Sequence, residues 1–319
     1  MKNSLLISIL VLSANIVIAQ LPGEKEWKKS LVNNRVQSQV QWNHKYEKGK
    51  PKKDGYKNFT KKFDHNGNVI EEVYYQSGTI DQKLSYKYEN KDNQVEYANY
   101  KGDEGKLLYK QNITYDNFGK KIREERFNGT EYQIIKYNYS GDKLLEITRS
   151  DIYGYVEHKR VFNYTGDVCI VDIKDDQSNV IGKLINKYDE NNNIIESTEY
   201  DEKDNIKEKY IYKFDGKLLK EKTKYAGDNF IYRETYKYNS KNLLDKVLKE
   251  KPEGNTITNN IYTYDSEGKL IEEQWYDNNP SENSKKTYYY NKKGLLEKVE
   301  VYYSLYRYRI QYKYEYTFY

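Results

Sequence analysis

Acidic side chains are plentiful among the residues that could do chemistry, and 49 Asp and Glu residues occur among the 319 residues. A glycosidase needs only two carboxyl groups at a suitable separation. These acids instead recur at one position in successive segments of the chain, as solvated strand positions do. We expect no catalytic residues and no enzyme activity, and an envelope hydrolase that cleaves carbohydrate through paired carboxylates is the alternative. The recurring acids are Glu71, Glu146, Glu196, Glu272 and Glu297.

Histidines and clustered acids form no metal motif in the sequence. No two of His44, His65 and His158 have the spacing of metal ligands on one element. The run 189–193 resembles the start of a calcium loop, but the sixth and twelfth positions lack the required Gly and Glu. Turn chemistry explains this run, and no Gly-x-Ser-x-Gly motif or phosphate-binding glycine loop is present. We expect no metal and no cofactor.

Aromatic residues are the remaining candidates, and the sequence holds 38 Tyr. Flat rings can stack on sugars, and Tyr packs through its ring while its hydroxyl stays hydrated. The same rings could equally form the core of a sheet that has little other apolar material. Both interpretations stay open. The expected ligand surface consists of Tyr262, Tyr264, Trp275, Tyr288, Tyr290, Tyr312 and Tyr314, with Lys313 and Lys286 nearby for acidic groups.

These aromatic residues belong to a regular pattern that extends over most of the chain. One aromatic residue stands just before each turn motif, and successive members of the set lie 24 to 27 residues apart. Self-similarity at 20 to 50 residues marks a repeat architecture. We call these residues the anchors: Phe63, Tyr88, Tyr115, Tyr139, Tyr164, Tyr188, Phe214, Tyr238, Tyr264 and Tyr290.

Two-residue alternation between the anchors predicts β-strands. In the segment 306–318, aromatic or apolar residues alternate with polar ones, which is typical of a half-buried strand. Most anchors are followed by Asp or Asn and then by Gly or Asn, and these residues favour tight turns. The run 23–32 is the only weak helical candidate after the first 19 residues.

The predicted fold is therefore all-β. It consists of tandem antiparallel β-hairpins with a period of about 25 residues. One hairpin alone is marginal, so the hairpins must stack, and we expect an elongated or spirally curved sheet. Residues 36–319 form a single domain of about eleven units, in which the first hairpin caps the stack. Residues 20–35 lead into this domain.

The first 19 residues have the pattern of a secretory signal peptide. Lys2 precedes an apolar run, and Ala19 offers a small residue at the expected cleavage point. We expect an exported protein that is periplasmic, associated with the cell envelope or secreted, with no stable membrane insertion after cleavage. An outer-membrane β-barrel is an alternative, but it needs a continuous apolar outer band, and alternate strand positions here carry Lys, Glu and Arg.

The charge pattern argues against a nucleic-acid partner, and the cysteine content argues against disulfides. The formal net charge is +5, and Lys and Glu are interspersed, so the basic stripe of a nucleic-acid binder is missing. The only cysteine, Cys169, aligns with Leu144 of the preceding unit, which predicts a small buried side chain. A single cysteine also leaves the chain without an intramolecular disulfide.

The turn motifs carry a family resemblance. The segments 236–239, 262–270 and 288–295 resemble the YD repeat of RHS proteins, with its Tyr-x-Tyr-Asp-x-x-Gly-x-Leu core. The resemblance covers roughly residues 36–319 and implies an extracytoplasmic β-sheet repeat protein. Long members wrap into shells around a C-terminal toxin, but these units are longer and fewer, so the toxin role is not implied. A more distant similarity links the hairpins to choline-binding repeats, whose Gly-Trp signature is absent.

Pattern and resemblance together predict a non-catalytic structural or binding protein at the cell envelope. We expect its partner to be an envelope glycan or another protein. Recognition would use the face that carries Tyr and Lys, or the open edges of the sheet. Binding spread over several hairpins would weaken gradually with successive Tyr→Ala changes.

Overall fold

Strands joined by short turns make up nearly all of the described chain, as the two-residue alternation predicted. A computed structural model describes residues 24–277 and 281–319. One helix, α1 (Glu24–Asn33), precedes the strands and occupies the weak helical candidate of the sequence. The predicted signal peptide lies outside the described residues.

The strand bounds follow the anchors closely, because each anchor stands at or next to the end of a strand. The strands are β1 (Val36–Glu47), β2 (Lys50–Pro51), β3 (Tyr56–Phe63), β4 (Val69–Gln76), β5 (Thr79–Glu89), β6 (Asn93–Lys101), β7 (Lys106–Tyr115), β8 (Lys121–Phe127), β9 (Tyr132–Ser140), β10 (Lys143–Asp151), β11 (Val156–Thr165), β12 (Val168–Lys174), β13 (Val180–Tyr188), β14 (Ile194–Asp201), β15 (Ile206–Asp215), β16 (Leu218–Ala226), β17 (Asn229–Tyr238), β18 (Leu244–Glu250), β19 (Thr256–Tyr264), β20 (Leu270–Trp275), β21 (Ser284–Tyr290), β22 (Leu296–Tyr303) and β23 (Tyr308–Phe318).

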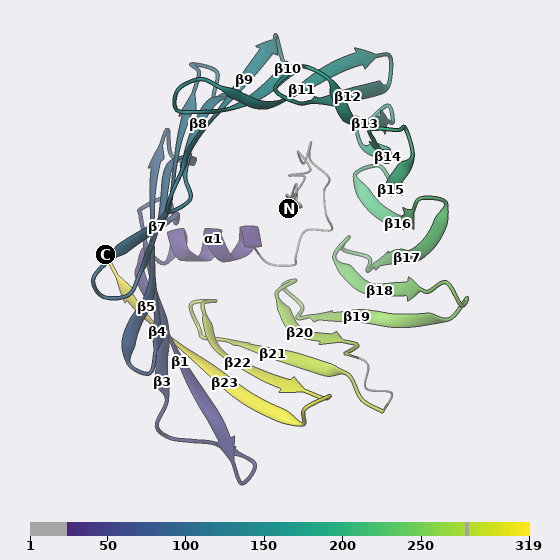
Figure 1. The fold of residues 1–319 in the computed structure, drawn as a ribbon. Helices are drawn as coiled ribbons and strands as arrows, with labels where there is room; N and C mark the ends of the chain where they lie inside the picture. The colour runs from purple at the N-terminus through teal and green to yellow at the C-terminus, as the bar shows by residue number, and fades with distance from the viewer. Residues whose placement is uncertain (1–23, 278–280) are drawn as a thin grey trace.

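The strands close into a barrel (Figure 1). From β3 onward each strand pairs antiparallel with the next, and β23 pairs with β1 from Val36↔Phe318 to Lys45↔Ile310. β1 also pairs with β3, and the two-residue β2 pairs only with β1. Within the described residues, β1 and β3–β23 therefore make a ring of 22 strands.

Closure corrects the predicted architecture. The expectation of an elongated or spirally curved sheet is wrong, and so is recognition through open sheet edges. Twist accumulates from strand to strand in one hand, and a barrel removes the unpaired edges that such a sheet would expose. The pairing of β1 with β23 joins segments about 270 residues apart, so a local period carries no information about it.

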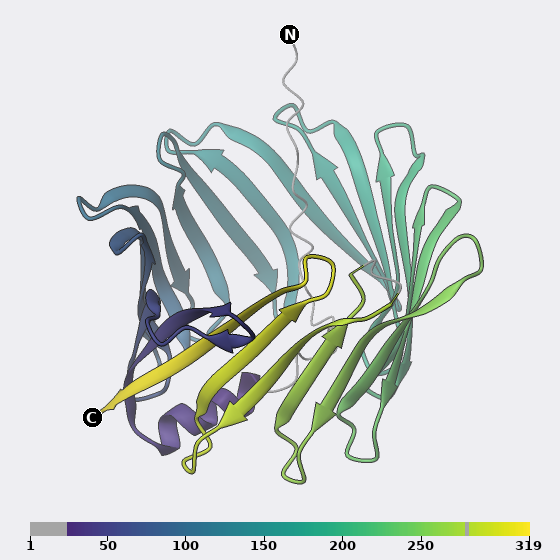
Figure 2. The same ribbon diagram turned by 90° about the horizontal axis from the view of Figure 1, so that it is seen from below.

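The barrel has two rims that differ in their turns (Figure 2). The turns that follow the anchors form one rim, which we call the anchor rim, and the loops in the middle of each repeat unit form the other, the loop rim. Tight turns on both rims use an Asp or Asn side-chain oxygen that accepts the backbone N–H groups two and four residues on. In one example, Asp189 Oδ1 accepts from Asn191 N at 3.0 Å and from Asn193 N at 2.8 Å.

The two faces of the barrel wall have different chemistry. α1 lies inside the ring and its Leu31 packs with Phe63 and Leu295, so the anchors face the lumen. Alternate positions face outward and carry Lys–Glu–Lys ion pairs. Glu71 contacts Lys62 at 2.8 Å and Lys83 at 2.7 Å. Equivalent outer triads form around Glu96, with Lys87 and Lys110, and around Glu196, with Lys187 and Lys209.

Anchor hydroxyls link neighbouring hairpins on the inner face. Tyr264 Oη donates to the Leu244 carbonyl at 2.8 Å, and Tyr290 Oη donates to the Leu270 carbonyl at 2.8 Å. The strand register also shifts at Tyr264 and Tyr290, so the wall carries a bulge beside these two anchors. Phe lacks this hydroxyl, so only a Tyr anchor can make the bond. The same bond is made by Tyr88, Tyr115, Tyr238 and Tyr316.

The described part of the chain holds no helix long and apolar enough to cross a bilayer.

Candidate binding site beside the lumen helix

One side of α1 fixes the helix against the barrel wall at the anchor rim. Leu31 is 1% exposed, and the Trp27 ring meets the Phe63 ring edge to face at 5.7 Å between centroids. Lys28 Nζ donates to Asn68 Oδ1 at 2.6 Å and pairs with Asp92 Oδ1 at 2.9 Å. A four-residue spacing places Trp27 and Leu31 on the same helical stripe, so the sequence itself favours this packing.

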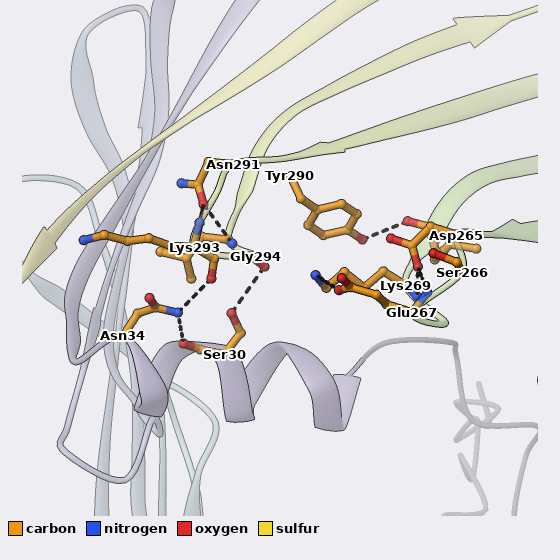
Figure 3. A network of polar contacts seen from close by, with 12 residues as sticks. Ser30, Asn34, Asp265, Ser266, Glu267, Lys269, Tyr290, Asn291, Lys293 and Gly294 are labelled. Atoms are coloured by element: carbon orange, nitrogen blue, oxygen red, sulfur yellow. Dashed lines mark hydrogen bonds and ion pairs between the residues drawn. The ribbon is translucent and has the colours of Figure 1, made fainter.

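The same helix also binds the turn between β21 and β22 (Figure 3). Ser30 Oγ donates to the Gly294 carbonyl at 3.3 Å, and Asn34 Nδ2 donates to the Lys293 carbonyl at 3.1 Å. Asn34 Nδ2 also donates to the Ser30 carbonyl at 2.8 Å, which holds the last turn of the helix. These contacts keep α1 at a defined position beside the inner wall.

A pocket of about 560 Å³ lies between α1 and the hairpins β19–β20 and β21–β22. This volume is within the range of small-molecule binding sites. Its aromatic lining comes from Trp27 of the helix and from Tyr288 and Tyr290 of the wall. Leu270 and Leu296 add aliphatic surface. The pocket therefore offers flat rings from two directions.

Cationic and amide groups complete the pocket. Lys29, Lys269 and Lys293 contribute three ammonium side chains to the lining, and Asn33 and Asn34 contribute amides. Lys269 Nζ lies 2.7 Å from Glu267 Oε2, and this carboxylate raises the pKa of the Lys269 ammonium. Lys293 Nζ lies 3.9 Å from the centroid of the Phe318 ring. The arrangement can hold an anionic ligand that also has a flat face for stacking.

The structure separates the residues of the predicted ligand surface. The seven aromatic residues lie on the inner wall, but only Tyr288 and Tyr290 line the pocket. Tyr262 is buried with 7% exposure, as the core interpretation expected. Trp275 packs edge to face on Tyr303 at 5.9 Å.

The two lysines of that surface lie on opposite faces of the wall. Lys313 pairs in register with Trp42 and Lys298 on the outer face, away from the rings. Lys286 faces the lumen, 5.3 Å from the Trp275 ring. Tyr312 and Tyr314 belong to the inner face of β23, beyond the pocket lining.

Sequence reasoning missed the contribution of α1 to this site. Trp27, Lys29, Ser30 and Asn33 stand in the lead-in segment, which the 25-residue period does not cover. The helical run itself could have indicated this packing, because Trp27 and Leu31 share one face of the helix and Lys29 lies on another. Nothing in the period indicates that this helix lies inside a ring.

Buried acids on the inner wall are neutralised by their neighbours. Glu124 is 1% exposed, and its carboxylate accepts hydrogen bonds from Gln111 Nε2 at 2.7 Å and Lys121 Nζ at 2.7 Å. Arg126 and Tyr137 donate to the same carboxylate. A carboxylate with this many donors is held in its charged form and has a structural use.

The predicted buried cysteine and the three histidines lie apart. Cys169 is 2% exposed on the inner wall, as its alignment predicted. His44 Nδ1 lies 2.9 Å from the Lys52 carbonyl, the His65 ring packs on Tyr319, and His158 stands on β11. Among the described residues, no three His, Cys, Asp or Glu side chains gather as metal ligands would.

Comparisons with known proteins find similarity in structure alone. No protein-family model matches the chain, and no curated protein matches it. The crystal structure of TcdB2-TccC3 without its hypervariable C-terminal region is similar with 15% identity and a TM-score of 0.42, over 80% of this chain. The chain spans only 14% of that protein's length.

Porin-like proteins are similar over nearly their whole length. One from Bacteroides uniformis ATCC 8492 has 8% identity and a TM-score of 0.32, over 89% of this chain and 97% of its own. One from Bacteroides vulgatus ATCC 8482 has 9% identity and a TM-score of 0.24, over 88% and 98%. These values concern the fold only, and the YD-repeat assignment stays a proposal.

The barrel also corrects the expectation about membranes. We predicted no stable membrane insertion, and that prediction is overturned, because closed barrels are one of two forms that can span a bilayer. The porin-like proteins share this kind of fold. The location of the protein is part of the proposal below.

Proposed function

We propose that the protein is a non-catalytic barrel of the cell envelope that binds an acidic saccharide in the pocket beside α1. The observation that carries this proposal is the convergence of Trp27, Tyr288 and Tyr290 with three lysines in one 560 Å³ pocket. Sugar rings stack on aromatic faces, and ammonium groups pair with the carboxylates of uronic or sialic acids. Amides of the helix supply hydrogen bonds to hydroxyl groups.

The size of the pocket supports a bound solute over a protein partner, because about 560 Å³ is within the range of small-molecule sites. The pocket lies between the wall and α1, which is inside the ring (Figure 1). The acidic class is favoured because Lys29 and Lys293 make no ion pair within the described residues. Glu267 neutralises only Lys269.

Calorimetry of the full chain with oligogalacturonate tests this function. We expect binding that weakens about tenfold in the variant Lys29→Gln/Lys293→Gln, since each ion pair at a partly exposed site contributes up to about 1 kcal/mol. A neutral maltooligosaccharide should bind more weakly than oligogalacturonate. Lys313→Gln, on the outer wall, is the matched control and should leave binding unchanged.

Two outcomes would contradict the proposed function. Oligogalacturonate, hyaluronate and sialyllactose could all fail to bind the wild type. Alternatively, Lys313→Gln could weaken binding as much as the double variant does. Loss in Trp27→Ala with retention in Lys29→Gln/Lys293→Gln would support stacking but not recognition of an acid.

A second candidate is an outer-membrane barrel, which closure of the ring favours. The outer face limits how such a barrel would sit, because the triads around Glu71, Glu96 and Glu196 would meet lipid. A Lys at the bilayer midplane of a barrel costs about 2–4 kcal/mol. Single-channel conductance of the purified chain in planar bilayers tests this candidate. Discrete conductance steps would support it, and their absence together with extraction by alkaline carbonate would remove it.

A further inference from the structure

The first and last hairpins form a distinct sector of the loop rim. The loop between β1 and β3 and the loop between β22 and β23 are neighbours there, because β23 pairs with β1 (Figures 1 and 2). We call this sector, residues 45–56 and 304–308, the lip. It lies at the opposite rim from α1 and shares no residue with the pocket lining.

One half of the lip is basic. Five lysines, all exposed, stand against one Glu and one Asp between residues 45 and 55. The segment is held in shape, because Lys48 and Gly49 adopt φ values of 49° and 78° in the tight turn. His44 Nδ1 lies 2.9 Å from the Lys52 carbonyl, and a Cβ at Gly55 would lie 2.6 Å from the His44 ring. The exposed lysines are Lys45, Lys48, Lys50, Lys52 and Lys53.

The other half of the lip presents apolar side chains to solvent. Leu305 is 51% exposed and Tyr306 is 76% exposed. Their turn is fixed from below, since Ser304 Oγ donates to Asp277 Oδ1 at 2.7 Å and Ser304 N donates to Ser284 Oγ at 2.8 Å. Both serines are at most 1% exposed. A buried polar network thus holds an aliphatic and an aromatic side chain outward.

Other parts of the loop rim differ in charge. The loop 201–205 carries three acidic residues and one basic residue. The loop between β10 and β11 also exposes aromatic side chains, Tyr153 at 81% and Tyr155 at 76%, but it follows Asp151 and contains no lysine. Among the described loops of this rim, only the lip combines exposed apolar side chains with a cluster of lysines.

We propose that the lip docks the barrel on a lipid surface that contains anionic headgroups. Lysines near such a surface gain from its negative potential, while Leu305 and Tyr306 enter the boundary between headgroups and acyl chains. An acidic polymer in water would use the lysines, but it offers no apolar layer for Leu305. The combination therefore favours lipid over a polyanion.

Co-sedimentation of the full chain with vesicles tests this docking. We expect binding to phosphatidylcholine vesicles that contain phosphatidylglycerol, and little binding to phosphatidylcholine alone. Lys48→Gln/Lys50→Gln/Lys53→Gln should lower the partition coefficient about fivefold for each lysine removed. Leu305→Ser/Tyr306→Ser should lower it at least tenfold, because two apolar side chains no longer enter the bilayer. Tyr153→Ser/Tyr155→Ser is the matched control and should bind as the wild type does.

Salt and competition distinguish the other outcomes. High salt should weaken the part of the binding that depends on the lysines, since they lie at the surface. Binding that resists salt and is unchanged in both lip variants would overturn the proposal, because the lip would then contribute nothing to it. Loss in the lysine variant with full retention in Leu305→Ser/Tyr306→Ser would overturn it in favour of a polyanion site. Far-ultraviolet circular dichroism of each variant checks that the barrel has folded.

Discussion

At the scale of single residues, the turn acids predict that the fold loses stability in acid. Side-chain amides and backbone N–H groups that bond Asp175, Asp189 and Asp201 hold the pKa of these carboxyls below its usual value. A lowered pKa in the folded state adds stability above the unfolded value of about 3.9. That stability is lost as the pH falls through the lowered folded value.

Replacing the three acids by Asn should reduce this acid sensitivity. Asn239 fills the same turn position with a neutral side chain, and its Oδ1 accepts from Lys241 N at 2.9 Å and from Leu243 N at 3.0 Å. We expect Asp175→Asn/Asp189→Asn/Asp201→Asn to keep the fold and to shift acid unfolding to lower pH, as measured by circular dichroism. Asp228→Asn is the control, and an equal shift in it would refute the explanation.

Anchor hydroxyls give a second prediction at this scale. Tyr264→Phe removes the bond to the Leu244 carbonyl. The free energy of unfolding should fall by about 0.5–1.5 kcal/mol, as measured by urea denaturation. Tyr153→Phe, at an 81% exposed position, should change it by less. Equal losses in both variants would mean that the anchor hydroxyl has no special part in the wall.

At the scale of elements, α1 should have a lower local stability than the barrel wall. The wall is held by strand pairing, whereas α1 is held mainly by Leu31, Trp27 and a few hydrogen bonds. Leu31→Ala should weaken helix docking by about 2–5 kcal/mol. We expect hydrogen exchange in α1 to quicken while exchange in β1–β23 stays slow. Lys29→Ala is the exposed control, and a general loss of protection in Leu31→Ala would contradict this independence.

Elements were more predictable than their assembly. Alternation in 306–318 predicted a strand, and β23 covers Tyr308–Phe318. Turn residues such as Asp265 and Gly268 predicted the tight turns that close the hairpins. Strict two-residue alternation would put Val36, Val40 and Trp42 on one face, but a register shift between Val36 and Ser38 places Val36 inward and the other two outward. A bulge inserts one residue and leaves no mark in the hydrophobic period.

The closure of the barrel and the pocket could not be predicted from the sequence, for a physical reason. Both depend on contacts between distant segments, such as Val40 with Glu315 and Ser30 with Gly294. A period reports neighbours along the chain, so it is equally compatible with an open stack and with a ring. The seven rings of the expected ligand surface share the inner face, but the position of α1 decides which of them border the pocket.

At the scale of the whole molecule, closure defines an inside and an outside. The inside carries rings and neutralised acids, and the outside carries ion-paired Lys and Glu. The two proposals therefore concern the lumen pocket and the lip, where exposed groups converge.

Disulfide trapping across β1 and β23 tests the closed ring most directly. Val40 and Glu315 are Cα partners on the outer face, so Val40→Cys/Glu315→Cys in a Cys169→Ser background should form an intramolecular disulfide in the native monomer. Val40→Cys/Glu196→Cys, on distant strands, is the control and should stay reduced. Mass spectrometry of the oxidised monomer reads the result. A ring predicts rapid cross-linking of the first pair alone, whereas free thiols or only intermolecular cross-links in that pair would show that the sheet is open.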